Sequence, residues 1–151
     1  MNSLMKYISR THRASNVYKS ASLLCEGLNS CQHIYIFHIC RNPGISQDKL
    51  AKKISVNKSS VTRQLGLLEQ NGFIRRESDS EDRRSLKVYP TEKAEGILPL
   101  IRNIMREWNE GIVEELTEGE REILISLMNR VMNKALQLAG IDEKEEDAGI
   151  Q

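Results

Sequence analysis

The fold is decided by residues 45–74, which read ISQDKLAKKISVNKSSVTRQLGLLEQNGFI. The pattern predicts a short helix over Gln47–Lys53 and a longer helix that begins after Asn57 and runs to about residue 71. Only residues 54–56 separate the two, which is typical of a helix-turn-helix. Asn57 is a good N-cap, and Gly72 suits the left-handed position at which a helix ends.

The longer helix has one apolar face and one polar face. At about 100° per residue, Val61, Leu65 and Leu68 point inward. Hydroxyls, an amide and basic side chains occupy the other side, and between Asn57 and Leu68 there is no acid. Such a face fits a DNA major groove, where we expect Lys58 to contact a phosphate and Arg63 to form a bidentate contact with a guanine. The residues of this helix and of the helix before it that we expect to contact DNA are Ser46, Gln47, Asn57, Lys58, Ser59, Ser60, Thr62 and Arg63.

After Gly72 the apolar period changes from 3.6 to 2. Residues 73–76 and 86–89 flank the polar stretch 78–85, which predicts a β-hairpin with a long charged loop. The loop carries Asp82, Arg83 and Arg84, and arginines suit the negative potential of a narrow minor groove. Asp82, two residues before Arg84, is placed to brace the loop by accepting a hydrogen bond.

Long amphipathic helices are predicted on both sides of this core. One runs over residues 4–28 with Cys25 on its apolar stripe, and one over Glu92–Leu116 with Pro99 inside it. Thr117 and Glu120 form a capping box before a last apolar stripe. A winged core of about sixty residues needs no such helices, so their stripes predict burial against a second copy of the chain. That copy would place two recognition helices about 34 Å apart.

At this point the chain resembles the MarR family of bacterial and archaeal regulators, over about residues 45–95. The resemblance is carried by the following motifs: Leu50-Ala51, Val61-Thr62-Arg63, Leu67-Leu68-Glu69-Gln70-Asn71-Gly72-Phe73-Ile74, Asp82-Arg83-Arg84 and Thr91-Glu92-Lys93-Ala94. It implies an interlocked homodimer on a pseudo-palindromic operator, with Arg84 in the minor groove and Asp82 supporting the wing. Pro90 and Ala94 depart from the usual pattern at a strand end and a helix start, which leaves the assignment intact.

The expected fold is therefore mainly α (α+β), a winged helix-turn-helix core with a two-stranded wing between N- and C-terminal dimerisation helices. We expect a single domain over residues 1–151. Its expected parts are dimerisation helices in 1–30 and 91–140, a DNA-binding lobe over 32–90 and an acidic tail over 142–151.

Composition and charge agree with this organisation. The net charge is +1, but residues 41–90 hold eleven Lys and Arg against six Asp and Glu, so positive charge is concentrated where phosphates are expected. No apolar run reaches the 18 or so residues of a membrane span, and the N-terminus lacks a signal-peptide pattern. Three cysteines without a Cys-x-x-Cys pair indicate neither a disulfide framework nor a zinc knuckle. We expect a cytoplasmic protein that makes no membrane contact.

The resemblance implies an effector, which in this family is a phenolic ligand, a metal or an oxidant. Cys31, His33, His38 and Cys40 do not close a metal tetrahedron on one helix, because each same-side pair lies about 10 Å apart along the axis. A peroxide sensor needs an exposed reactive thiol, and the position of the reactive cysteine in the oxidant-sensing branch of the family falls near His12 or Thr11, where this chain has no thiol. A small-molecule pocket is favoured. Its expected lining residues are His12, Tyr35, His38 and Trp108.

The sequence thus predicts a homodimeric, sequence-specific transcription regulator of double-stranded DNA, a repressor modulated by a small molecule. Two alternatives stay open: a winged-helix module that docks proteins, and a redox- or metal-sensing regulator of the same fold. No clustered His-acid pair, nucleophile elbow or phosphate loop appears, so no enzyme and no cofactor are expected.

Overall fold

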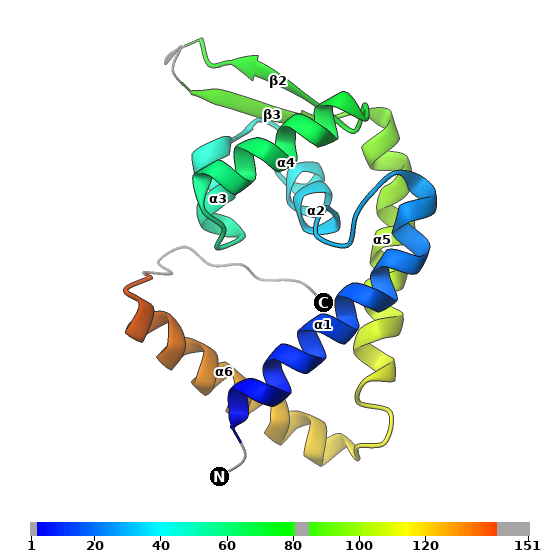
Figure 1. Cartoon of the computed structure of the whole chain (residues 1–151), viewed down its shortest axis with the longest axis vertical. Helices are drawn as coiled ribbons and strands as arrows, with labels where there is room; N and C mark the ends of the chain where they lie inside the picture. The colour runs from blue at the N-terminus through cyan, green and yellow to red at the C-terminus, as the bar shows by residue number, and fades with distance from the viewer. Residues whose placement is uncertain (1–2, 81–84, 142–151) are drawn as a thin grey trace. The chain divides into compact units, whose positions relative to one another are not determined.

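The computed structural model describes residues 3–80 and 85–141 and divides the chain into two compact units, Met1–Met105 and Arg106–Gln151 (Figure 1). The helix α5 crosses the boundary between them. In chain order the elements are α1 (Leu4–Leu23), η1 (Leu24–Glu26), α2 (His33–Arg41), β1 (Ile45–Ser46), α3 (Gln47–Lys53), α4 (Lys58–Gln70), β2 (Ile74–Ser78), β3 (Leu86–Pro90), α5 (Glu92–Gly111) and α6 (Glu118–Ala139).

The first unit is built on one hydrophobic core, to which α2, α3, α4, the sheet and the first half of α5 all contribute. Its largest fully buried side chains are Phe73, Leu23, Leu28, Ile36, Ile39, Leu50, Leu65, Leu68, Ile101, Val61 and Val88. The inward face predicted for α4 is confirmed, because Val61, Leu65 and Leu68 are all at most 1% exposed. This burial fixes which face of α4 stays outside.

The sheet has three antiparallel strands in the order β1-β3-β2, one more than the predicted two-stranded wing. Ile45 pairs with Val88, and the amide of Gly44 donates to the carbonyl of Val88 at 2.8 Å. Gly44 has φ +82°, and a Cβ there would lie 3.2 Å from the Tyr89 ring, so only glycine fits this turn without strain. The extra strand is two residues long and so carries no period that a sequence pattern could show.

The first helix is shorter than the predicted 4–28, because α1 gives way to a 3₁₀ turn that Gly27 ends at φ +79°. The expectation that Cys25 packs in the core is wrong. Its side chain is exposed, as are Ala21 and Tyr18 one and two turns before it, because the face of α1 that this chain buries carries Ser15, Lys19 and Leu23 instead.

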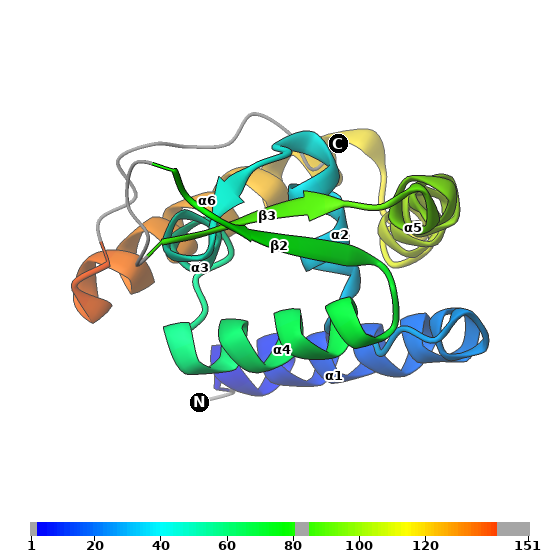
Figure 2. The same cartoon turned by 90° about the horizontal axis from the view of Figure 1, so that it is seen from above.

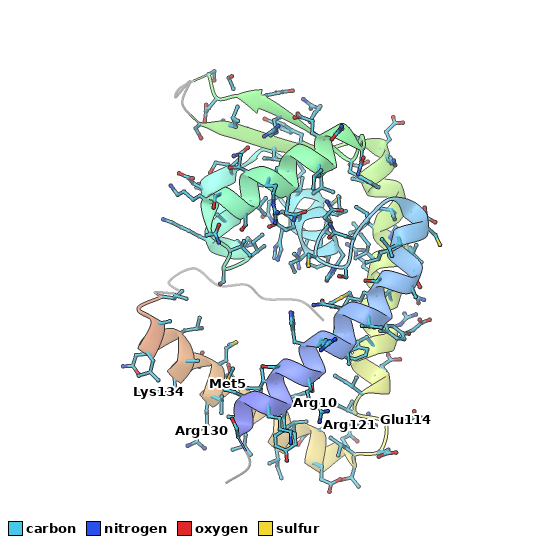
Figure 3. All side chains as sticks on the ribbon, viewed as in Figure 1. Met5, Arg10, Glu114, Arg121, Arg130 and Lys134 are labelled. Atoms are coloured by element: carbon cyan, nitrogen blue, oxygen red, sulfur yellow. The ribbon has the colours of Figure 1, made fainter. Side chains whose placement is uncertain are left out.

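The helix predicted over Glu92–Leu116 also ends early, at Gly111. Amides of Val113 and Glu114 bond three residues back, to the carbonyls of Glu110 and Gly111, which turns the chain away from the helix. Arg121 then donates to the carbonyls of Leu116 and Glu114 at 3.1 and 3.4 Å; Figure 3 labels Arg121 and Glu114 at this turn. Glycine, a poor helix former, sets the end of α5, and Arg121 satisfies two carbonyls of the turn that follows it.

Candidate nucleic-acid interface

The turn between α3 and α4 holds the two helices of the motif together. Ser46 caps α3 by accepting the amide of Lys49 at 3.2 Å. Ser55 takes a left-handed φ of 52°, and the amide of Val56 donates to the carbonyl of Ala51 at 3.0 Å. A left-handed non-glycine residue reverses the chain in few residues, so α4 begins directly beside α3.

Asn57 fixes the start of α4. Its Oδ1 accepts the amide of Ser60 at 2.8 Å and the hydroxyl of Ser59 at 2.8 Å. The predicted cap is therefore present, and it satisfies one of the amides that a helix leaves unpaired at its N-terminus. The remaining amide dipoles point outward, which favours negative charge such as a phosphate at this end.

The exposed face of α4 carries the residues expected to contact DNA. Lys58, Ser59, Thr62 and Arg63 are exposed and Ser60 is half-buried. Thr62 donates its hydroxyl proton to the carbonyl of Lys58 at 2.9 Å, so its oxygen keeps acceptor capacity toward a donor outside the protein. Arg63 is exposed, so its guanidinium is open to solvent, where a base or phosphate can reach it.

Lys58 is the exception on this face, because its ammonium lies 2.9 Å from a carboxylate oxygen of Asp48 on α3. The two side chains are 73% and 64% exposed. An exposed pair of this kind contributes little stability and is screened by salt. Lys58 can therefore leave Asp48 for a phosphate at small cost.

Glu69 is the one acid of α4, and Arg76 on β2 neutralises it. Arg76 Nη2 lies 2.6 Å and Nε 3.0 Å from Glu69 Oε2. Arg76 Nη1 also donates to Oε1 of Gln47 at 3.4 Å, so the predicted DNA contact Gln47 is half-buried and faces the wing. Sequence reasoning missed this junction. The available signal was the single acid in an otherwise acid-free helix.

The β2–β3 hairpin starts at the C-terminal end of α4 and runs back toward the side at which α4 begins (Figures 1 and 2). Arg75 lies over the Tyr89 ring at 4.5 Å, and Lys87 pairs with Asp79 at 3.2 Å. The C-terminal end of β2 and the N-terminal end of β3 thus lie on the same side of the lobe as the N-terminus of α4. The wing residues Asp82, Arg83 and Arg84 fall outside the described residues, and their roles stay predictions.

The residues predicted to line an effector pocket differ in exposure. Tyr35 and His38 are each 3% exposed, whereas His12 is exposed and its ring nitrogen contacts Asn16 at 3.2 Å. Trp108 is half-buried and belongs to the second unit. Burial of Tyr35 and His38 is typical of a structural role, and the pocket stays a prediction.

The cysteines are not alike. Cys25 and Cys31 are exposed, while burial raises the pKa of the half-buried Cys40 to about 11, which keeps its thiol protonated. Over residues 3–80 and 85–141, no group of three His, Cys, Asp or Glu side chains is arranged to hold a metal ion. In the same ranges no helix has the length and apolar character to cross a lipid bilayer.

Comparison with known proteins adds to this geometry. A family model described as "MarR family" matches residues 28–86. An uncharacterized HTH-type transcriptional regulator of Bacillus subtilis, YybA, is 31% identical over 131 residues, which are 87% of each chain.

Solved structures agree with the sequence matches. A crystal structure titled MarR has 33% identity, a TM-score of 0.79 and coverage of 91% of this chain and 94% of its own. A putative MarR family regulator from Listeria monocytogenes, crystallised with a 26mer DNA, has 25% identity, a TM-score of 0.82 and coverage of 99% and 100%. The expected fold class is confirmed.

Proposed function

The chain belongs to the MarR family of DNA-binding transcription regulators, and we propose that it acts in the cytoplasm as a homodimeric repressor on a pseudo-palindromic operator. The observation that carries this proposal is the outward face of α4. It is basic and hydroxyl-rich, its start is fixed by Asn57, and its one acid, Glu69, is paired with Arg76. A basic helix is attracted to the DNA phosphates, whereas an acidic helix is repelled by them.

Each lobe contacts two grooves in this proposal. The N-terminal half of α4 enters the major groove, where Arg63 contacts a guanine edge and Lys58 a phosphate. Ser46 and Gln47 approach the backbone from α3. Arg84, in the loop of the hairpin, enters the adjacent minor groove in this proposal, with Asp82 bracing it. The DNA-bound Listeria neighbour supports the use of this fold on duplex DNA.

The homodimer is supported by apolar side chains that their own unit leaves in water. No residue of α6 is buried, and Ile123, Leu127 and Leu138 are 61%, 49% and 78% exposed. An apolar face of this length on a helix indicates an interface. Two copies of the lobe then bind two half-sites, and a dimer seated across a promoter blocks transcription.

A small-molecule effector completes the proposal. It would bind near His12, Tyr35, His38 and Trp108 and shift the dimer away from the spacing that fits two half-sites. The alternative of a protein-docking module expects an apolar α4 face. Leu67, at 41% exposure, is the only exposed large apolar side chain of α4, so the helix does not favour it.

A gel-shift titration on duplexes that the protein selects from its source genome tests the proposal. Arg63→Ala should weaken binding about tenfold to a hundredfold, the loss expected for one guanine contact. Arg102→Ala, an exposed arginine of α5, serves as control and should bind like the wild type. The affinity of the wild type should fall steeply with salt. A flat salt response, or an Arg63→Ala protein that binds as well as the wild type, would refute the proposal.

A further inference from the structure

The junction of Glu69 and Arg76 joins the two parts of the lobe that face DNA. Both carboxylate oxygens of Glu69 are used: Oε1 accepts the backbone amide of Arg76 at 3.0 Å, and Oε2 accepts Nε and Nη2 at 3.0 and 2.6 Å. Charge-assisted bonds from one guanidinium to one carboxylate fix orientation as well as distance. The last turn of α4 is therefore held to β2 in one geometry.

Arg76 also connects this pair to the rest of the lobe. Its backbone pairs with Val88 of β3 within the hairpin, and its Nη1 reaches Gln47 at the start of α3. The Arg76 side chain is only 21% exposed, so water competes little for these bonds. One side chain thus bonds to α3 and α4 from within the hairpin.

Apart from this pair, the chain passes from α4 to β2 through a tight turn. Gly72 has φ +77°, and the amide of Phe73 donates to the carbonyl of Leu68 at 2.9 Å. The hairpin is also held through β3, because Ile45 and Ser46 of β1 pair with Val88 and Lys87. Glu69 and Arg76 lie on the opposite edge of the hairpin, beyond the turn on both sides, where they oppose a rotation of β2 about Gly72 relative to α4.

We propose that Glu69 and Arg76 are positioning residues, which set the angle between α4 and the hairpin so that one lobe contacts the major and the minor groove together. This inference rests on the proposed function. Neither residue contacts DNA in this arrangement. Without the pair, α4 can still bind the major groove, but the hairpin no longer adds its minor-groove contact to the affinity.

The strand supplies a matched control. Arg75 and Glu77 form a second Arg–Glu ion pair, but both residues lie on β2, and their side chains are 55% and 52% exposed. Glu77→Gln removes one negative charge from β2 and Glu69→Gln removes one from the end of α4 that packs against β2, so their general electrostatic effects on DNA affinity match. Only Glu69→Gln breaks a bond between two elements.

The test uses two duplexes that differ only in the minor groove. The first is the best duplex that the wild-type protein selects from a random pool, with I·C pairs at the positions flanking each half-site. The second has G·C pairs there, which add an amino group in the minor groove and leave the major groove unchanged. The wild type and Glu77→Gln should prefer the I·C duplex about tenfold. Glu69→Gln should bind both duplexes about equally.

Arg76→Lys provides a second variant, since lysine keeps the positive charge but cannot donate two parallel hydrogen bonds to one carboxylate. This variant should lose most of the preference for the I·C duplex. Thermal unfolding monitored by circular dichroism reports whether each variant is folded, and Arg76→Lys carries the test if Glu69→Gln is not. A folded variant that binds both duplexes more weakly by one common factor would overturn the inference, as would a wild type without the preference. A wild type that selects no duplex would instead overturn the proposed function.

Discussion

Lys19 and His33 are two basic side chains of the first unit that the fold buries, each 8% exposed. Burial and, to a smaller extent, the positive charge of Lys19 together lower the pKa of His33 to about 4. His33 Nδ1 lies 2.6 Å from the carbonyl oxygen of Ser30, and because a carbonyl only accepts, this nitrogen carries the proton of the neutral ring. The folded protein therefore holds His33 uncharged near neutral pH.

This burial predicts a pH dependence of stability. The unfolded chain protonates His33 below about pH 6.5, whereas the folded protein does so only below about 4. Between these values unfolding takes up a proton, so the free energy of unfolding should fall as the pH drops from 6.5 to 4, by about 3 kcal/mol at most. His33→Asn keeps a donor for Ser30 and removes the titrating ring. Urea unfolding at several pH values should show a shallower slope for this variant.

The titration of carboxylates does not change the slope of stability against pH differently in the wild type and in His33→Asn. Hydrogen bonds from Arg76 and from Thr117 lower the pKa values of Glu69 and Glu120, so their contributions are lost below about pH 4.5 in both proteins. The comparison between wild type and His33→Asn removes them. Equal slopes from pH 6.5 to 4 would contradict the burial of a neutral histidine.

At the residue scale, the sequence predicts side chains whose environment follows from helix period. Val61, Leu65 and Leu68 are buried and Arg63 is exposed, as a 3.6-residue repeat requires. The Glu69–Arg76 pair was not predictable in this way. Its seven-residue separation spans a turn, so the contact depends on how β2 folds back on α4 and not on any local period.

At the element scale, the start of α4 needs a helix cap for stability and an absence of negative charge for DNA binding. Variants of Asn57 separate these two requirements. Asn57→Ala removes the acceptor for the Ser60 amide and should lower the free energy of unfolding by about 1 kcal/mol. Asn57→Asp keeps the cap and favours the helix dipole, so stability should hold. The added negative charge should nevertheless weaken DNA binding. Urea unfolding and gel shifts on the same preparations measure the two effects.

Asn57→Ser is the control for this series, because serine caps a helix and adds no charge. It should resemble the wild type in stability. An Asn57→Asp protein that binds DNA as tightly as the wild type would show that the N-terminus of α4 does not approach phosphates.

Element boundaries were predicted well where capping chemistry marks them. Asn57 and Thr117 each accept the expected amide, and α3, which Ser46 caps, has the predicted bounds. Prediction failed where an element depends on partners far away in sequence. The strand β1 exists because Ile45 meets Val88 of β3. The early end of α5 has a local cause, the glycine at position 111, which the period of the apolar residues did not show.

At the scale of the whole molecule, the second unit exposes more large apolar side chains than a helix in water normally carries, which indicates one side of an interface. Its exposed large apolar side chains are Ile112, Ile123, Leu124, Ile125, Leu127, Met128, Met132, Leu138 and Ile141. Leu124, Leu127 and Met128 lie within about 100° on one face of α6, a stripe that normally packs against another helix. The acidic tail predicted over 142–151 lies outside the described residues.

A charge placed in this stripe should dissociate the dimer. Leu127→Asp introduces one buried carboxylate per copy, and the symmetry of a homodimer doubles its unfavourable effect. Light scattering at micromolar concentration should give twice the 17.3 kDa chain mass for the wild type and the single-chain mass for Leu127→Asp. Asn133→Asp adds the same charge about 120° to 180° away from the stripe and should remain dimeric. The monomer should also bind an operator with two half-sites far more weakly, since the second half-site contact is no longer intramolecular. A wild type of single-chain mass, or a Leu127→Asp protein that stays dimeric, would exclude this face of α6 as the interface.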